Sequence, residues 1–327
     1  MTSCLSGRMA RRSSRDTDPD REPSGSRAGG RRYTPDMEYA HPESLVDPAW
    51  LTAHLEDPNL RVLDLRFDLR PGRDGQLEPT PGREEYETGH IPGAIFVDLD
   101  QDLAHPDAPL EILSPERFEA LMGRLGVGND TTVVLHDGSG GTWAARLWWA
   151  LRYYGHDDVR LLDGGYARWV REGHPTDSHP VRPDPTRFEA RVRPELRVTR
   201  DEVLAAIDRD DVCIVDALPE PFYRGEAKLY PGHRAGHIPG ARNLPAPANL
   251  DPGSSTLLPA DALERLWKDA GVPRNQRVIT YCGGGVFAAF SLFVLHLLGV
   301  ENAALYDASW SEWGADPSLP IETGPPA

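Results

Sequence analysis

The sequence predicts an α/β protein made of two similar halves, each an open, mostly parallel sheet flanked by helices. Three observations lead to this fold class. Short apolar strands alternate with helical segments, as in parallel sheets with helical crossovers. One set of motifs occurs twice in the same order. The longest apolar helix follows a buried strand and a glycine turn, an arrangement typical of the carboxyl edge of such sheets.

The internal repeat is defined by four landmarks at nearly one spacing. Each half has a strand ending in Asp, a GHIPGA turn, a strand followed by a glycine turn, and an aromatic helical turn. The matched positions lie 144 to 152 residues apart: Asp64 and Asp216, His90 and His237, Asp137 and Cys282, Tyr166 and Trp310. We therefore expect a first domain at 41–172, a Pro- and Arg-rich linker at 173–196, a second domain at 197–321 and a C-terminal tail at 322–327.

Residues 1–40 are rich in Arg, Ser, Gly and Pro and predict a disordered tail. This tail has no apolar core of the kind a secretion signal needs. Its acidic residues, from Asp16 to Glu22, argue against a transit peptide. Met37 precedes the first structured segment, so we expect residues 1–36 to be dispensable.

The first half opens at Asp47-Pro48, an N-cap followed by proline at the first helical position. A strand is predicted at 61–66, and a second helix begins at Ser114-Pro115. The strand 131–136 leads into a glycine turn and a helix. A short strand and a helical turn at 159–173 complete the half.

The second half repeats this order. Thr199 and Glu202 form a capping box that opens a helix. A strand is predicted at 212–218, followed by the second GHIPGA turn. The segment 278–299 then reads as a buried strand, a turn of Cys282 and three glycines, and a long apolar helix.

Composition excludes several classes of function. The chain has 327 residues and a net charge of −16, which makes nucleic acid and anionic membranes unfavourable partners. Its cysteines, Cys4, Cys213 and Cys282, form no CxxC and no Cys/His pair, so we expect no disulfide, no metal and no cofactor. A reduced, cytoplasmic setting follows from this cysteine usage. No apolar run reaches membrane-spanning length.

Cys282 is the predicted nucleophile. Glycines allow a tight turn that aims successive N–H groups at one point, and the following helix directs its positive end there. A thiol at the mouth of such a loop is expected to ionise more readily than free cysteine. The alternative is a buried structural cysteine beside a glycine turn. The loop residues are Gly283, Gly284, Gly285, Val286 and Phe287.

The repeat also supplies a comparison within the chain. Where the second half has Cys282, the first half has Asp137, followed by the same kind of glycine turn. Aspartate cannot act as a sulfur nucleophile, and its own charge would fill an anion-binding loop. The second half is therefore the predicted catalyst, and the first half is a scaffold.

The tandem halves, the two GHIPGA turns and the segments YCGGGV, LLDGG and YDASWSEWG resemble a two-domain rhodanese-type sulfurtransferase over residues 45–321. That family includes thiosulfate and 3-mercaptopyruvate sulfurtransferases. The resemblance implies that Cys282 takes a sulfane sulfur from such a donor, rests as a persulfide, and passes the sulfur to cyanide, a thiol or a thioredoxin-like reductant. Backbone N–H groups from Gly283 to Phe287 would stabilise the persulfide charge.

This chain departs from the family pattern at the donor site. Phe222 stands where members usually have an arginine three residues before Gly225, and Leu218 replaces the arginine of a frequent Asp-Ala-Arg. Gly284 and Phe287 stand where mercaptopyruvate enzymes have Ser or Thr. The remaining candidates for donor binding are Arg224, Lys228 and Arg234, with Asp100 and Glu111 contributed by the first half.

Other interpretations of these motifs are weaker. A Cys-loop phosphatase needs an arginine six residues after the cysteine, and that position is Ala288. The final glycine of a dinucleotide motif would fall at Trp143. His90 and His237 occur in both halves, so we expect them to brace the turns. The open alternative is a persulfide carrier or binding module without efficient turnover of small donors.

Overall fold

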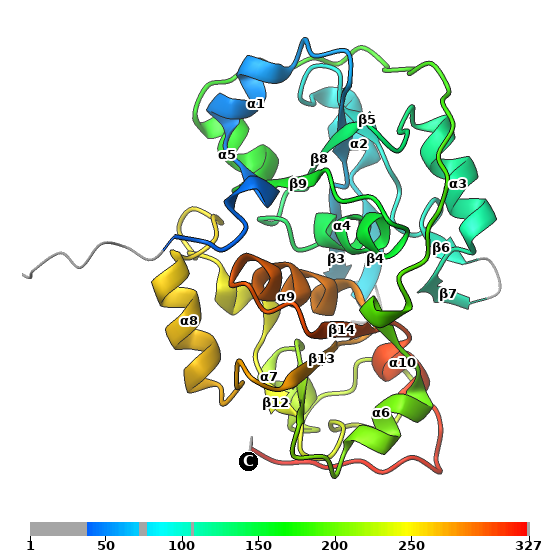
Figure 1. Ribbon diagram of the computed structural model, residues 1–327, viewed down its shortest axis with the longest axis vertical. Coiled ribbons are helices and arrows are strands. Elements are labelled where there is room, and N and C mark those ends of the chain that lie inside the picture. Colours follow the sequence, from blue (N-terminus) through cyan, green and yellow to red (C-terminus); the bar gives the residue numbers. More distant parts are fainter. Residues whose placement is uncertain (1–37, 72–76, 106–107, 326–327) are drawn as a thin grey trace, which may run out of the picture. The chain divides into compact units, whose positions relative to one another are not determined.

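The computed structural model describes residues 38–71, 77–105 and 108–325, which form two five-stranded sheets of the same topology (Figure 1). Every neighbouring pair of strands in these sheets is parallel. The first sheet has the order β1 (Leu45–Val46), β9 (Val159–Leu162), β8 (Thr132–His136), β2 (Leu60–Asp64), β5 (Ile95–Phe96). The second has the order β10 (Arg197–Val198), β14 (Ala303–Tyr306), β13 (Arg277–Tyr281), β11 (Val212–Asp216), β12 (Arg242–Asn243). The predicted fold class is confirmed.

The helices repeat in the same way. The first half has α1 (Pro48–His54), α2 (Arg83–Thr88), α3 (Pro115–Arg124), α4 (Ala144–Tyr153) and α5 (Gly165–Arg171). Their counterparts are α6 (Arg200–Ala206), α7 (Glu220–Tyr223), α8 (Ala260–Asp269), α9 (Val286–Leu297) and α10 (Ser309–Trp313). Short 3₁₀ turns lie at Pro42–Ser44, Pro194–Leu196 and Ala246–Asn249. Two antiparallel hairpins, β3 (Phe67–Pro71) with β4 (Leu77–Pro81) and β6 (Ala104–His105) with β7 (Ala108–Ile112), belong to the first half.

The two predicted helix caps are present. The Asp47 carboxylate accepts a hydrogen bond of 2.7 Å from the Trp50 N–H and opens α1. Thr199 and Glu202 form the reciprocal capping box of α6. Each cap satisfies N–H groups that a helix start leaves free.

Helices α4 and α9 pack against each other between the halves (Figure 1). Residues 144–151 of α4 are all buried, as are residues 288–295 of α9. The Trp148 and Phe293 rings meet edge to face, with centroids 5.0 Å apart. A helix that is apolar on every side belongs in an interior. This explains why the segment after Cys282 is long and apolar without spanning a membrane. Within the described ranges, no helix combines the length and apolar character that crossing a membrane requires.

The predicted linker and C-terminal tail both continue the folded halves. Asp177 pairs with His90 through an antiparallel backbone bridge, and Glu322 pairs with His237 in the same way. The rings of His90 and His237 lie 2.7 Å from the carbonyls of Tyr86 and Tyr223 and stack on those tyrosine rings. The structural role predicted for both histidines is confirmed.

The predicted tail 1–40 falls outside the described residues except for its last three. Of these, Tyr39 donates a hydrogen bond of 2.6 Å from its hydroxyl to the Leu258 carbonyl. The Ala40 N–H donates to the Leu297 carbonyl. Residues just after Met37 therefore contact the second half.

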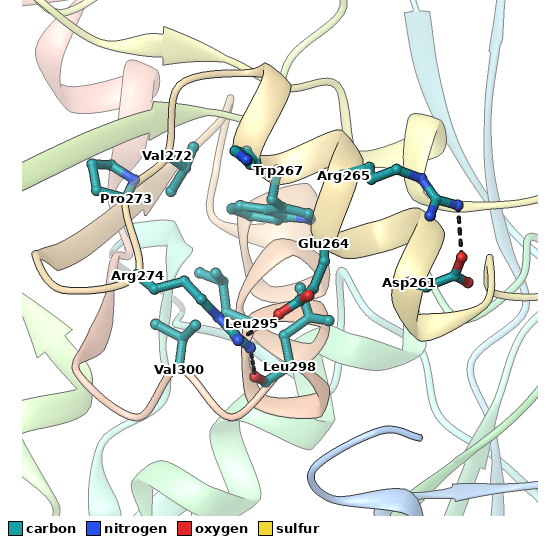
Figure 2. A pocket seen from close by; sticks show the side chains of 11 residues that line it. Asp261, Glu264, Arg265, Trp267, Val272, Pro273, Arg274, Leu295, Leu298 and Val300 are labelled. Atoms are coloured by element: carbon teal, nitrogen blue, oxygen red, sulfur yellow. Dashed lines mark hydrogen bonds and ion pairs between the residues drawn. The ribbon is translucent and has the colours of Figure 1, made fainter. Parts of the chain in front are cut away.

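A cavity of about 470 Å³ lies on the second half between α8 and the carboxyl end of α9 (Figure 2). Trp267, Leu295 and Leu298 supply apolar walls, and Glu264 and Arg274 pair beside them. Cys282 lies before the opposite end of α9. A 12-residue helix is about 18 Å long, so this cavity is not part of the Cys282 site.

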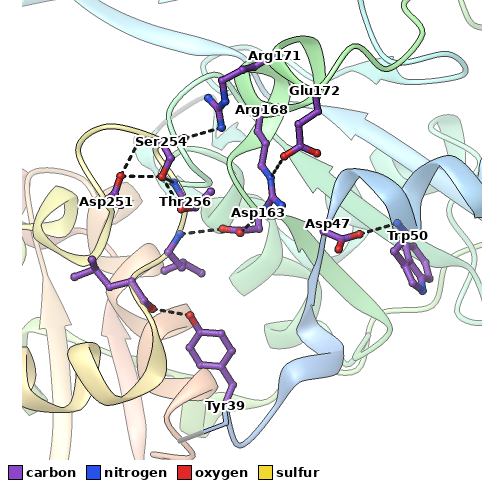
Figure 3. Close-up of polar contacts among 12 residues, drawn as sticks. Tyr39, Asp47, Trp50, Asp163, Arg168, Arg171, Glu172, Asp251, Ser254 and Thr256 are labelled. Carbon is purple, nitrogen blue, oxygen red and sulfur yellow. Dashed lines mark hydrogen bonds and ion pairs between the residues drawn. The ribbon is translucent and has the colours of Figure 1, made fainter. Parts of the chain in front are cut away.

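Two equivalent hydrogen bonds connect the halves. The Leu257 N–H donates to the Asp163 carboxylate over 2.9 Å (Figure 3). The Ile112 N–H donates to the Asp307 carboxylate over 2.9 Å. Each aspartate follows the last strand of its own sheet, β9 or β14, so the repeat extends to the contact between the halves.

The two aspartates differ in their cations. Arg168 pairs with Asp163 over 2.7 Å, within the first half and partly exposed. Arg146 of α4 pairs with Asp307 over 2.5 Å, across the halves, and both side chains are buried. Removing one member of a buried pair leaves the other charge without compensation.

We expect Asp307→Ala to lower the free energy of unfolding by about 3–5 kcal/mol because the buried Arg146 guanidinium loses its carboxylate and the Ile112 N–H loses its acceptor. The matched variant Asp163→Ala is expected to cost about 1–2 kcal/mol, since Arg168 can turn to solvent. Urea unfolding followed by tryptophan fluorescence measures both. Equal losses would contradict the assignment of the main interdomain charge pair to Asp307.

Candidate active site around Cys282

Cys282 follows β13 directly, and α9 begins four residues later at Val286. Gly285, at the helix start, has a φ of +76°, and an added Cβ would lie 2.7 Å from Arg146 Nη1 and from the Asp307 carbonyl. Only glycine fits this position without displacement. The Cys282 N–H donates to Ser309 Oγ over 3.1 Å, which joins the loop to α10.

The loop aims backbone N–H groups at the thiol. The N–H groups of Gly284, Phe287 and Ala288 hydrogen-bond the Cys282 sulfur and favour its charged form. The first two lie in the predicted range 283–287. Ala288 lies one residue beyond it, inside the first turn of α9. The helix start therefore contributes to the anion site together with the glycine turn.

The first half forms the same loop around a carboxylate. Asp137 Oδ1 accepts hydrogen bonds from the N–H groups of Ser139 (2.7 Å) and Gly141 (2.9 Å). Its Oδ2 accepts from Trp143 (2.7 Å) and Ala144 (3.0 Å). The prediction that Asp137 fills its own anion-binding loop is confirmed.

The predicted ease of ionisation was wrong for this state of the site. Only 2% of Cys282 is exposed, and burial raises the pKa of its thiol. The three N–H groups act in the opposite direction, and the negative charge of Asp216 adds to the increase in pKa. The sequence motif reveals the local donors but not the loss of water around the sulfur, which dominates here.

Aromatic and apolar side chains from both halves surround the loop. The Phe287 ring lies 5.3 Å from Trp143, which in turn lies 4.8 Å from Phe67. Leu229 and Tyr230 approach Gly283 from the segment before the second GHIPGA turn. Sequence reasoning missed Tyr230 because that segment has no periodic pattern.

The three predicted cations have other contacts. Arg224 lies between Glu220 (3.2 Å) and Glu226 (3.6 Å). Arg234 donates to the carbonyls of Trp313, Asp316 and Leu319, and so fixes the end of the second half. Lys228 is exposed and has no ion pair among the described residues. None of these contacts involves the Cys282 loop.

The two acidic candidates from the first half differ in position. Glu111 pairs with Arg197 over 2.6 Å, and Arg197 also lies 3.6 Å from Asp307. Glu111 therefore belongs to the charge network between the halves, which includes Asp307 beside the Cys282 loop. Asp100 is exposed, and its N–H donates to the Asp98 carboxylate.

The role of Asp307 could have been predicted from the sequence, because the YDASWSEWG motif aligns this residue with the Asp of LLDGG.

The strands that end in Asp64 and Asp216 differ in their charge balance. Both carboxylates accept the N–H of the second following residue, as predicted for bracing groups. Asp64 is also paired with Arg66 over 2.8 Å. The second half has Leu218 at that position, and burial raises the pKa of Asp216 to about 7.

Comparison with known proteins agrees with this description. The family model of the rhodanese-like domain matches residues 47–172 and 199–316. The chain belongs to the rhodanese family. The two matched ranges correspond to the two halves that contain the two five-stranded sheets.

The chain is similar to two curated proteins over nearly their whole lengths. It is 38% identical to the sulfur carrier protein TtuD of Thermus thermophilus, over 88% of this chain and 99% of the relative. It is 36% identical to the 3-mercaptopyruvate sulfurtransferase of Escherichia coli, over 85% and 97%. The crystal structure of SseA, a 3-mercaptopyruvate enzyme of Escherichia coli, matches with a TM-score of 0.73 at 33% identity, over 82% and 98%. The predicted sulfurtransferase class is confirmed.

We expect Asp216→Asn to remove a pH-dependent loss of stability. A carboxyl group with a pKa of about 7 in the folded state and about 4 in the unfolded state destabilises the fold as pH rises between these values. The cost is absent below pH ~4, complete above pH ~7, and amounts to roughly 2–4 kcal/mol for the wild type. Urea unfolding at several pH values tests this.

Asp64→Asn is the matched control. It is expected to destabilise the protein at neutral pH because Arg66 would remain buried without its partner. The prediction would be contradicted if the free energy of unfolding of the wild type rose between pH 4 and 7 and that of Asp216→Asn followed the same curve. Ionisation of Asp216 would then not be a source of lost stability.

Proposed function

We propose that this rhodanese moves a sulfane sulfur from a small donor, thiosulfate or 3-mercaptopyruvate, through a persulfide on Cys282 to a thiophilic acceptor. The observation that carries the proposal is the convergence of the Gly284, Phe287 and Ala288 N–H groups on the Cys282 sulfur. The names of the relatives support the same chemistry.

The proposed cycle has two balanced steps. The Cys282 thiolate attacks the donor's transferable sulfur, an S–S bond forms, and the donor's bond to that sulfur breaks. Thiosulfate leaves as sulfite, and 3-mercaptopyruvate leaves as the enolate of pyruvate, which takes up a proton. Cyanide or a thiolate then attacks the terminal sulfur and the S–S bond breaks. Thiocyanate or a new persulfide leaves, and the electron pair returns to the Cys282 sulfur. The three N–H groups stabilise Cys282 both as nucleophile and as leaving group.

Donor recognition is proposed to depend little on positive side chains. Arg224 and Lys228 remain candidates for contacting an anionic donor at the entrance, since Arg224 is about one-third exposed and Lys228 is exposed. Arg234 is less suitable because its guanidinium already binds three carbonyls. Glu111 and Asp100 would act from the first half, by holding the charge network and by facing the acceptor.

A persulfide carrier without efficient turnover of small donors is the second candidate. Phe222, at the usual arginine position, packs against the apolar core, and the loop is enclosed by aromatic groups. A relative with 38% identity is named a sulfur carrier protein. A reduced, cytoplasmic location is proposed for either activity, consistent with Cys213 and Cys282 both being free thiols.

We expect Cys282→Ser to abolish sulfur transfer and Cys213→Ser to leave it nearly unchanged. Cys213 is buried in β11 and its pKa is raised to about 11, so little thiolate forms at neutral pH. Mass spectrometry after incubation with either donor should show the gain of one sulfur atom on Cys282. Comparable losses of sulfur transfer in both variants, or a gain of sulfur on Cys213, would contradict the assignment of Cys282 as the nucleophile. A wild type that gains sulfur but releases no thiocyanate to cyanide would favour the carrier.

We expect Phe222→Arg to strengthen the use of anionic donors by restoring a cation at the family's usual position. The KM for thiosulfate should fall by about tenfold, the size of one charge-assisted hydrogen bond, with a smaller change in kcat. Phe222→Leu is the control for loss of the ring alone. A KM that is the same in all three proteins would show that this position does not contact the donor.

A further inference from the structure

Leu229 and Tyr230 cover the loop that carries Cys282. A Cβ added to Gly283 would lie 2.6 Å from Leu229 Cδ2 and 2.9 Å from the Tyr230 hydroxyl. Both side chains come from the connection between α7 and the second GHIPGA turn, and Leu229 packs against the apolar core. A side chain at 283 would displace the ends of Leu229 and Tyr230, so glycine lets both lie against the loop that follows the buried Cys282.

The Tyr230 hydroxyl lies beside Gly283, the residue that follows Cys282. Burial and the nearby Cys282 charge both raise the pKa of Tyr230, so the phenol keeps its proton at neutral pH. Among residues 38–71, 77–105 and 108–325, no group accepts a hydrogen bond from this hydroxyl. His233 packs beside its ring, with centroids 5.1 Å apart. The described residues thus leave this hydroxyl available as a donor beside the Cys282 loop.

The second half-reaction needs such a donor. The persulfide carries a negative charge on its terminal sulfur, and cyanide and thiolate acceptors are also anions. The N–H groups of Gly284, Phe287 and Ala288 are directed at the inner sulfur. The side chains of the loop, which are glycine, Val286 and Phe287, have no hydrogen-bonding group. The loop therefore offers the terminal sulfur backbone N–H groups only, and none of its side chains offsets the repulsion between the two anions.

We propose that Tyr230 donates a hydrogen bond from its hydroxyl to the terminal sulfur of the Cys282 persulfide, and that Leu229 and Tyr230 together form a cover that opens to admit donor and acceptor. This inference rests on the proposed function. The proton stays on the phenol, which withdraws charge from the sulfur under attack and makes transfer to an anionic acceptor faster.

The hydroxyl is tested with Tyr230→Phe, which keeps the ring. Cys282 is loaded with inorganic polysulfide, so that no natural donor is required, and release of sulfur to cyanide is followed in a single turnover. We expect release to slow by about tenfold or more, while the rate of alkylation of the unloaded thiol stays unchanged. Tyr223→Phe is the control, since its hydroxyl bonds the Ala241 carbonyl in the same half.

The cover is tested with Leu229→Ala, which removes bulk but no polar group. Alkylation of Cys282 by iodoacetamide is expected to become about tenfold faster or more, with Tyr223→Phe again unchanged. Equal release rates for Tyr230→Phe and wild type would overturn the role of the hydroxyl, and an unchanged alkylation rate in Leu229→Ala would overturn the cover. A wild type that polysulfide cannot load would instead overturn the proposed function.

Discussion

A pair of equivalent hydrogen bonds, each from a backbone N–H of one half to an aspartate of the other, joins the two halves beside the packed helices α4 and α9. Asp163 and Asp307 occupy the same place in the repeat, directly after the last strand of each sheet. Because the Asp307 carbonyl also lies against Gly285, one residue takes part both in the contact between the halves and in the packing of the Cys282 loop.

Duplication followed by divergence explains the chemistry of the two loops. Both loops direct helix-start N–H groups at one point, and the first is filled permanently by Asp137. A carboxylate bound by four N–H groups is a stable anion without a nucleophilic role. A sulfur in the same position is bound as an anion only when it ionises, so the second half keeps a site whose charge changes during a reaction.

Local features of this fold could be predicted from the sequence because short-range interactions determine them. The strand ending at Asp216, the capping box at Thr199 and the filled loop of Asp137 are all of this kind. The remaining features depend on long-range packing. Arg234 contacts carbonyls about 80 residues away, and Tyr230 approaches Gly283 from an irregular segment, so neither contact is visible in a local motif.

The buried state of Cys282 follows from the same distinction between local and long-range effects. Its three N–H donors favour the thiolate, whereas the surrounding apolar side chains favour the thiol, and in the closed site the second effect is larger. Water or a polar donor entering the site would weaken the desolvation without changing the N–H groups, because these belong to the loop and to α9. Ionisation of Cys282 would then accompany opening of the site, and the closed enzyme would keep an unreactive thiol.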